Sequence, residues 1–186
     1  MGRHGRFGGA GFTLIELMVV VAVVVVLQTL AAPALSGMVN SMRMTAAANS
    51  LFSSLFFARN EAIKRNSRVV VCKSATGSAC AGSGGWEQGW IVFHDVNNNA
   101  ALDAGETLLS REQTLPDPIR LTGNNPVVSY VSYTPMGTTS YISGAFQAGT
   151  LTVCQQSATP VDARLIVISS AGRPRTVKTT VGYCPL

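Results

Sequence analysis

The sequence predicts an α+β protein in which a long N-terminal helix packs on a mostly antiparallel, β-rich globular domain. The 186 residues leave room for one domain of ordinary size plus an extended element. No charged residue occurs between Leu17 and Met42, and short β-branched runs follow from Arg68 onward. Charged residues are 12% of the chain, about half of the ~25% usual in soluble domains, and apolar residues reach 47%. This composition excludes a disordered chain.

The helix is expected over residues 12–66, with an interruption at Pro33 because proline removes one backbone hydrogen bond. Beyond Pro33, apolar residues recur at the three- and four-residue spacing of an amphipathic helix. These residues are Met44, Ala47, Ala48, Leu51, Phe52, Leu55, Phe56, Ala62 and Ile63. We therefore expect the second half of the helix to pack on the globular domain.

The globular domain is expected over residues 67–186, where the pattern changes to short runs bounded by Gly, Pro, Asn and Ser. Such runs predict strands of mostly antiparallel sheets. The runs cover residues 69–72, 90–94, 127–133, 150–154 and 164–169. No further helix is required.

The apolar stretch near the N-terminus follows Arg3 and Arg6, and two kinds of segment fit it. One is a secretory signal, with the small residues 31–34 as a cleavage site. That reading leaves Glu16 unexplained, because a carboxylate at membrane depth costs about 2.5 to 3.5 kcal/mol and needs a cation or access to head groups. Cleavage after Gly11 would place the new amino group of Phe12 one helical turn from Glu16.

The order Gly11-Phe12-Thr13-Leu14-Ile15-Glu16, followed by an uncharged run, resembles the class III leader of type IV pilins and type II secretion pseudopilins. The resemblance implies a type IV pilin-like fold and removal of leader 1–11 by prepilin peptidase between Gly11 and Phe12. It further implies N-methylation of Phe12 and a role of Glu16 in assembly with other pilins or pseudopilins. The first half of helix 12–66 would be a single transmembrane span of the inner membrane, and the head would be periplasmic before the chain enters a pilus or pseudopilus filament.

Four cysteines lie in the expected globular domain, and three pairings are possible. We expect disulfides between Cys72 and Cys80 and between Cys154 and Cys184. The first would close a short loop beside a strand, and the second would hold the C-terminal tail. Zinc is disfavoured because no two cysteines have the close spacing of a metal site. Buried free thiols are the alternative, which export to an oxidising compartment disfavours.

Within the globular domain the resemblance narrows to the proteins called FimT or FimU in pili and GspH in secretion systems. The matching residues are Arg59, Glu61, Ala62, Cys72, Trp86, Gly89, Trp90, Phe93, Asp95, Val96, Asn97, Gly105, Glu106, Leu108 and Leu109. Gly172-Arg173-Pro174-Arg175 resembles the GRxR motif of FimT proteins, to which the chain is most similar. That motif implies DNA capture in natural transformation.

The residues themselves also suggest anion binding near the C-terminus. Arg173 and Arg175 flank a proline that favours extended backbone, so their guanidinium groups should face one way and could engage successive phosphates. Lys178 adds a third cation, and residues 163–186 carry four bases and no acid, hence +4. The alternative is a solvated basic edge that resists aggregation. DNA binding would be led by phosphate contacts and sensitive to salt.

An acidic stretch at residues 87–117, with six acids and one base and hence −5, contains a candidate calcium loop. Its oxygen donors fall at positions 1, 3, 5, 9 and 12 of such a loop: Asp95, Asn97, Asn99, Asp103 and Glu106. Ala100 departs from the pattern where a sharp turn needs Gly. The flanks are expected strands, so the alternative is an Asn-rich hairpin turn.

The sequence as a whole predicts a minor pilin of a type IV pilus that binds DNA through its C-terminal loop. The first alternative is the H-type minor pseudopilin of a type II secretion system, and the second is a membrane-tethered calcium-binding module. We expect no enzyme and no cofactor, because the single histidine beyond the leader, His94, lacks a catalytic constellation apart from neighbouring Asp95.

Overall fold

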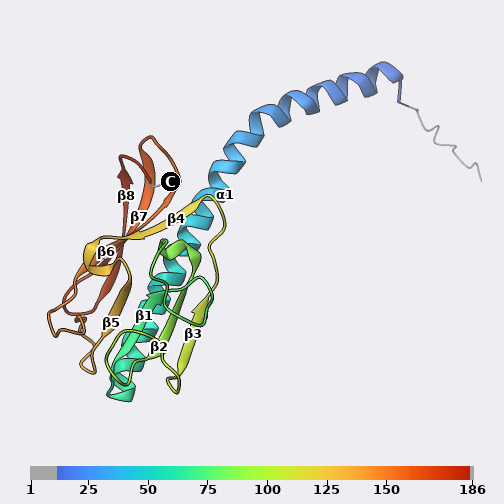
Figure 1. Cartoon of the computed structure of the whole chain (residues 1–186). Helices are drawn as coiled ribbons and strands as arrows, with labels where there is room; N and C mark the ends of the chain where they lie inside the picture. Colours follow the sequence, from blue (N-terminus) through green and yellow to red (C-terminus); the bar gives the residue numbers. More distant parts are fainter. Residues whose placement is uncertain (1–11, 185–186) are drawn as a thin grey trace, which may run out of the picture. The chain divides into compact units, whose positions relative to one another are not determined.

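The computed structural model describes residues 12–184, apart from the side chains of residues 30–34 and 36 (Figure 1). The N-terminal helix α1 runs from Leu14 to Arg65. It is continuous through Pro33, so the interruption expected there is wrong. A single missing hydrogen bond leaves the bonds on both sides of the proline in place, and the helix can propagate through it.

Helix α1 ends within one residue of the predicted end, and Asn66 follows it in the left-handed conformation. Asn66 has a φ of 48°, and the amides of Asn66 and Ser67 donate to the carbonyls of Ile63 and Ala62. This is the usual way in which a helix satisfies its last carbonyl groups.

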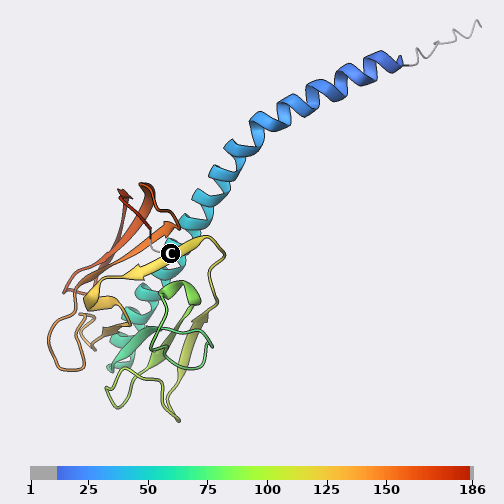
Figure 2. The same ribbon diagram turned by 45° about the horizontal axis from the view of Figure 1, so that its top comes forward.

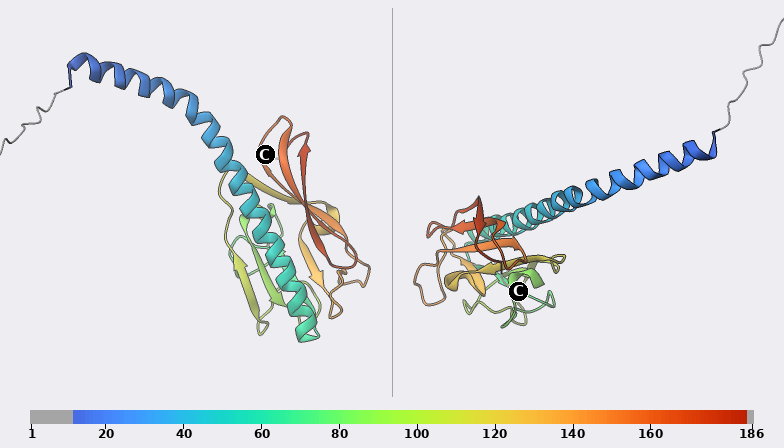
Figure 3. Two further views of the ribbon diagram at one scale, coloured as in Figure 1. Left: turned by 180° about the vertical axis from the view of Figure 1, so that it is seen from behind. Right: turned by 90° about the horizontal axis from the view of Figure 1, so that it is seen from above.

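The chain divides into two compact units, residues 1–39 and residues 40–186, so the boundary lies inside α1. The second unit contains the C-terminal part of α1 and two four-stranded antiparallel sheets. Seen from behind, this part of α1 lies across both sheets (Figure 3, left). The predicted α+β class, with a helix on antiparallel sheets, is confirmed.

The first sheet has the strand order β3-β2-β1-β5 and the second has the order β4-β6-β7-β8. The strands are β1 Val69–Lys73, β2 Trp90–His94, β3 Leu108–Glu112, β4 Ile119–Gly123, β5 Tyr130–Tyr133, β6 Gly149–Gln155, β7 Val161–Ile168 and β8 Pro174–Val181. Figure 2 shows β7 and β8, in orange and red, on the side away from the sheet of β1 and β2.

Each of the five predicted runs contributes to a strand, but β3, β4 and β8 were not predicted. β4 carries Arg120 between its buried Ile119 and Leu121, and β8 begins at Pro174 and is exposed or half-buried throughout. Their hydrophobic signal is therefore weak, and cross-strand hydrogen bonding rather than residue type makes them strands. Two short 3₁₀ helices also occur where none was expected, η1 Trp86–Gln88 and η2 Asn125–Val127.

The main core joins α1 to the inner faces of both sheets, and α1 contributes Met44, Ala47, Ala48, Leu51, Leu55, Ala58 and Ala62. Trp86 and Trp90 are fully buried, and their indole nitrogens donate to the Val127 carbonyl and to Ser54 Oγ. Phe56 and Ile63 were predicted to face the core but are 48% and 46% exposed. These two side chains lie at the margin of the apolar stripe of α1, outside the residues of the helix that the core buries.

Candidate functional site

The predicted GRPR motif forms the turn between β7 and β8. The amide of Gly172 donates to the Ser169 carbonyl over 2.8 Å, and the amide of Ser169 donates to the Arg173 carbonyl over 3.5 Å. Gly172 has a φ of +73°, a conformation that side chains other than glycine rarely adopt. A glycine is therefore required at the point where the turn reverses the chain.

This turn is anchored on a second glycine turn that rests on α1. A Cβ atom on Gly172 would overlap the carbonyl oxygen of Gly137. That same oxygen accepts a 2.8 Å hydrogen bond from Arg59 Nε on α1. A Cβ atom on Gly137 would in turn lie 2.7 Å from Ile63 Cδ1. One backbone contact, from Gly172 to Gly137, and the side chains of Arg59 and Ile63 against Gly137 thus place the residue that follows Gly172 relative to the helix.

Arg173 directly precedes β8 and Arg175 is its second residue, and both side chains are exposed. Neither forms an ion pair within residues 12–184. β8 is the last strand of its sheet, so the two guanidinium groups stand at an open sheet edge.

Lys178 is separated from Arg175 by the alternation of β8. Arg175 is opposite Val167, whereas Lys178 is opposite Arg164. Residues three apart on a strand point to opposite faces. The fold therefore groups Lys178 with Arg164 and not with Arg175. The three-residue spacing of Arg175 and Lys178 would have predicted this separation if β8 had been recognised as a strand.

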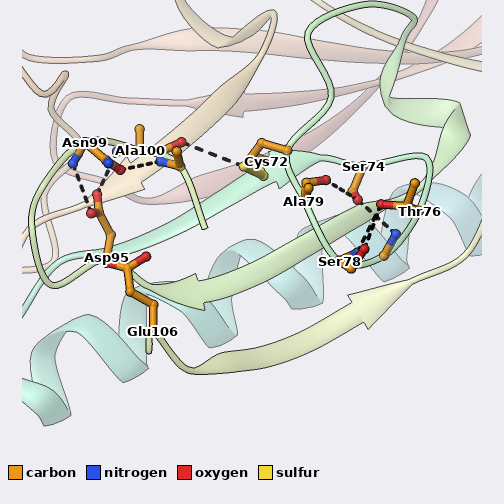
Figure 4. The surroundings of a disulfide bond; sticks show 12 residues. Cys72, Ser74, Thr76, Ser78, Ala79, Asp95, Asn99, Ala100 and Glu106 are labelled. Carbon is orange, nitrogen blue, oxygen red and sulfur yellow. Dashed lines mark hydrogen bonds between the residues drawn. A yellow bond between two sulfur atoms is a disulfide. The ribbon is translucent and has the colours of Figure 1, made fainter. Parts of the chain in front are cut away.

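Both predicted disulfides are present, Cys72–Cys80 and Cys154–Cys184. The first joins β1 to the loop 74–85, and Cys80 packs with Ala100 in a small apolar cluster under the loop 95–106 (Figure 4). The second joins β6 to the tail after β8 and packs on Ala163. The two bridges stabilise different sheets.

The candidate calcium loop, residues 95–106, connects β2 to β3 and is closed by its own side chains. The carboxylate of Asp95 is fully buried and accepts 3.0 Å hydrogen bonds from the amides of Asn99 and Ala100. Asp103 Oδ2 accepts from the Asn97 and Asn99 amide groups at 2.8 and 2.6 Å. These amide donors hold the pKa of the Asp103 carboxyl below its usual value.

Glu106 completes this arrangement by accepting from the amides of Val96 and Asp103. Ala100 adopts a φ of 58°, which fits a turn but is unfavourable for alanine. In the described part of the chain, no three carboxylate, histidine or cysteine side chains gather as a metal site would require. The loop is thus a self-bonded hairpin connection, and its first residue, Asp95, bonds to backbone amides.

The predicted assembly residue Glu16 is in the first turn of α1 and is exposed. Its amide donates to Thr13 Oγ1 over 3.3 Å, so Thr13 caps the helix. Phe12 is 85% exposed, and Gly11, the other side of the expected cleavage site, lies outside the described residues. Among residues 12–184, no helix combines the length and the apolar character that crossing a membrane requires.

Two protein families match this chain, one over its N-terminal segment and one over most of the remainder. Residues 47–172 match the family model described as type II transport protein GspH. Residues 8–31 match the model of the prokaryotic N-terminal methylation motif. A pilin-like protein of Thermus thermophilus, PilA1, is 36% identical over 96 residues, which are 52% of this chain and 54% of the relative. The chain therefore spans about half the length of this curated relative.

Two crystal structures of the type IV minor pilin FimU of Pseudomonas aeruginosa share the fold. The TM-scores are 0.51 and 0.53, with sequence identities of 18% and 17%. The matched regions cover 75% and 76% of this chain and 98% and 94% of the FimU chains. At this level of identity the likeness concerns the fold alone.

Proposed function

The chain belongs to the GspH family, within the type IV minor pilins and pseudopilins, and from this premise we propose that it is a minor pilin of a type IV pilus. It assembles with other pilins through its N-terminal helix and acts by assembly and binding, without catalytic turnover. The support is the methylation-motif match at residues 8–31 together with the GspH match over the head.

We propose that prepilin peptidase cuts the chain between Gly11 and Phe12 and that Phe12 is then methylated. The uncharged segment up to Met42 would anchor the chain in the inner membrane, with the head in the periplasm, until the chain enters the filament. Glu16 would bind the amino group of a neighbouring Phe12 during assembly.

The assembly proposal is tested by Glu16→Ala. The variant should accumulate in the membrane at the wild-type level but be absent from sheared filaments. Glu61→Ala, which changes an equal charge at the far end of α1, is the control and should assemble normally. Equal amounts of wild-type protein and of the Glu16 variant in filaments would contradict the proposal.

The processing proposal is tested by mass spectrometry of the mature chain, which should begin at methylated Phe12.

We further propose that Arg173 and Arg175 bind DNA during natural transformation. The observation that carries this proposal is the exposure of both arginine side chains beside the edge strand β8, on a turn that Gly172 holds against the Gly137 turn. Exposed, unpaired arginines lose little on binding and can contact successive backbone phosphates.

The test measures binding of a DNA duplex by the full-length mature protein in detergent. Two phosphate contacts predict an affinity that falls about tenfold between about 50 and 200 mM salt. Arg173→Ala/Arg175→Ala should lose most of this affinity and of its salt dependence. Lys64→Ala/Arg111→Ala removes the same charge elsewhere and should behave as the wild type. Equal affinities of the two double variants would reject DNA binding at this turn.

The second candidate is the H-type pseudopilin of a type II secretion system, which the description of the matching family model favours. The DNA assay separates the two, because a pseudopilin of a secretion system needs no specific contribution of Arg173 and Arg175. Recovery of the chain in surface pili rather than in a secretion complex would support the pilus.

A further inference from the structure

Two cations face each other across the last two strands of the second sheet. Arg164 on β7 is directly opposite Lys178 on β8. Directly opposed residues of an antiparallel pair point to the same face with their Cβ atoms about 4.5 to 5.5 Å apart, and like charges there are destabilising. This cross-strand position therefore holds two bases and no acid.

Arg164 is largely enclosed but has few protein partners, and its guanidinium nitrogens are not among the buried polar atoms that lack a hydrogen bond, so they remain accessible at the surface. It is only 9% exposed, and its one hydrogen bond in the described structure runs 3.4 Å from Nη1 to the carbonyl of its neighbour Ala163. Within residues 12–184 it forms no ion pair. Asp162 shares its face two residues earlier but does not come within 4.0 Å. Arginine is rarely buried without a partner, because desolvation of the charge is costly.

Lys178 completes an open site beside this guanidinium. It is exposed, and β8 is the edge strand, so a ligand could approach from the edge. Edge strands often carry lysine to prevent pairing with other chains. That role accounts for exposed Lys178 but not for Arg164, which is on an inner strand and nearly buried.

We infer that Arg164 and Lys178 bind a carboxylate of a neighbouring subunit, on the face of the β7–β8 hairpin opposite to Arg175. The choice of a subunit as the source rests on the proposed assembly with other pilins. A planar guanidinium binds a carboxylate through two parallel hydrogen bonds, and the lysine supplies a second charge. A recessed guanidinium suits a protruding acidic side chain better than the convex backbone of a DNA duplex, which meets exposed groups.

The first experiment uses acetate as the minimal carboxylate probe on the full-length mature protein in detergent. Acetate replaces chloride at constant ionic strength and neutral pH, and the midpoint of thermal unfolding is measured. A ligand that binds only the folded state raises the midpoint, here by about 2 to 4 °C at saturating acetate. Lys178→Glu places a carboxylate opposite Arg164, so it should raise the midpoint in chloride and abolish the response to acetate.

Arg111→Glu is the matched control, because it makes a change of charge of the same size at an exposed position of the other sheet, on β3. It should keep the wild-type response to acetate. A Lys178→Glu variant that still responds to acetate, or that is no more stable in chloride than Arg111→Glu, would overturn the site.

The source of the carboxylate is tested in filaments and with DNA. If a neighbouring subunit supplies it, the new carboxylate of Lys178→Glu occupies Arg164 and reduces incorporation into filaments, whereas Arg111→Glu does not. Normal incorporation of Lys178→Glu would overturn the proposed partner. A loss of duplex affinity in Lys178→Glu as large as in Arg175→Glu would assign the site to phosphate instead. These results are independent of Glu16→Ala and of the Arg173/Arg175 double variant, so failure here is distinguishable from failure of the proposed function.

Discussion

Gly172 and Gly137 are in backbone contact so close that a Cβ atom on Gly172 would overlap the carbonyl oxygen of Gly137. The contact joins the β7–β8 turn to the turn that Arg59 holds on α1. The turn that carries the exposed arginines after Gly172 is thereby linked to α1 through Gly137 and Arg59.

Gly172→Ala should lower the free energy of unfolding by about 1 to 3 kcal/mol, because it combines an unfavourable positive φ with a steric overlap. Gly182→Ala is the matched control, since nothing lies within 4 Å of a Cβ at that position. Denaturant unfolding of both variants checks the prediction. Equal stability of the two would show that the turn can move away from Gly137.

Asp95→Ala should lower the free energy of unfolding by about 2 to 3 kcal/mol, because the Ala100 amide would lose its acceptor and the Asn99 amide would keep only Asn97 Oδ1. Asp117→Ala is the control, because the Asp117 side chain is 89% exposed. Chemical denaturation gives both values. If Asp95→Ala lowers the free energy of unfolding by no more than Asp117→Ala does, water replaces the carboxylate as the acceptor of these amides.

Calcium should leave the midpoint of thermal unfolding of the wild type unchanged. The carboxylate oxygens that would bind calcium in the loop 95–106 already accept hydrogen bonds from side-chain amides and backbone amides of the same loop. The measurement compares millimolar calcium with a chelator at equal ionic strength. A rise in the midpoint that Asp103→Asn removes would instead support the calcium-binding alternative.

Replacing both cysteines of a bridge by serine should cost more stability for Cys154–Cys184 than for Cys72–Cys80. The loops that they close span 30 and 8 residues. Loop-closure entropy gives about 3.6 and 2.5 kcal/mol, respectively. Thermal unfolding of the two double variants checks the order, and the reverse order would show that local packing outweighs chain entropy.

Acid should destabilise the head partly through Glu61. Its carboxyl is bonded to Arg65 over 2.7 Å and lies 3.5 Å from Lys64 Nζ. The hydrogen bond from Arg65, followed by the attraction of Lys64, holds the pKa of Glu61 below 4.5. Because the folded pKa is lower than the unfolded one, this stabilisation is present above about pH 4.5 and is lost as the pH falls through the folded pKa.

Arg65→Gln should therefore narrow the difference in thermal midpoint between neutral and acidic pH. Arg43→Gln, an exposed cation on the same helix without an ion pair in the described chain, should not. An unchanged pH dependence in Arg65→Gln would show that Glu61 contributes no linkage to protonation.

Much of the fold could be predicted because the helix and five of the strands depend on patterns of residues close together in the chain. The spacing of Met44, Leu51 and Leu55 indicated the helix, and the β-branched runs indicated five strands. β8 escaped prediction because a half-polar edge strand has no hydrophobic face to detect. The missing strand also hid the separation of Lys178 from Arg175.

The sequence by itself determined the leader motif, the helix, the four paired cysteines and the basic C-terminal segment, because each depends on residue types close together in the chain or on a short list of pairings. Only the tertiary structure decided that Gly172 meets Gly137, that Arg164 faces Lys178 and that the loop 95–106 bonds to itself. These relations depend on strand register and on contacts between residues distant in sequence, which spacing along the chain does not encode.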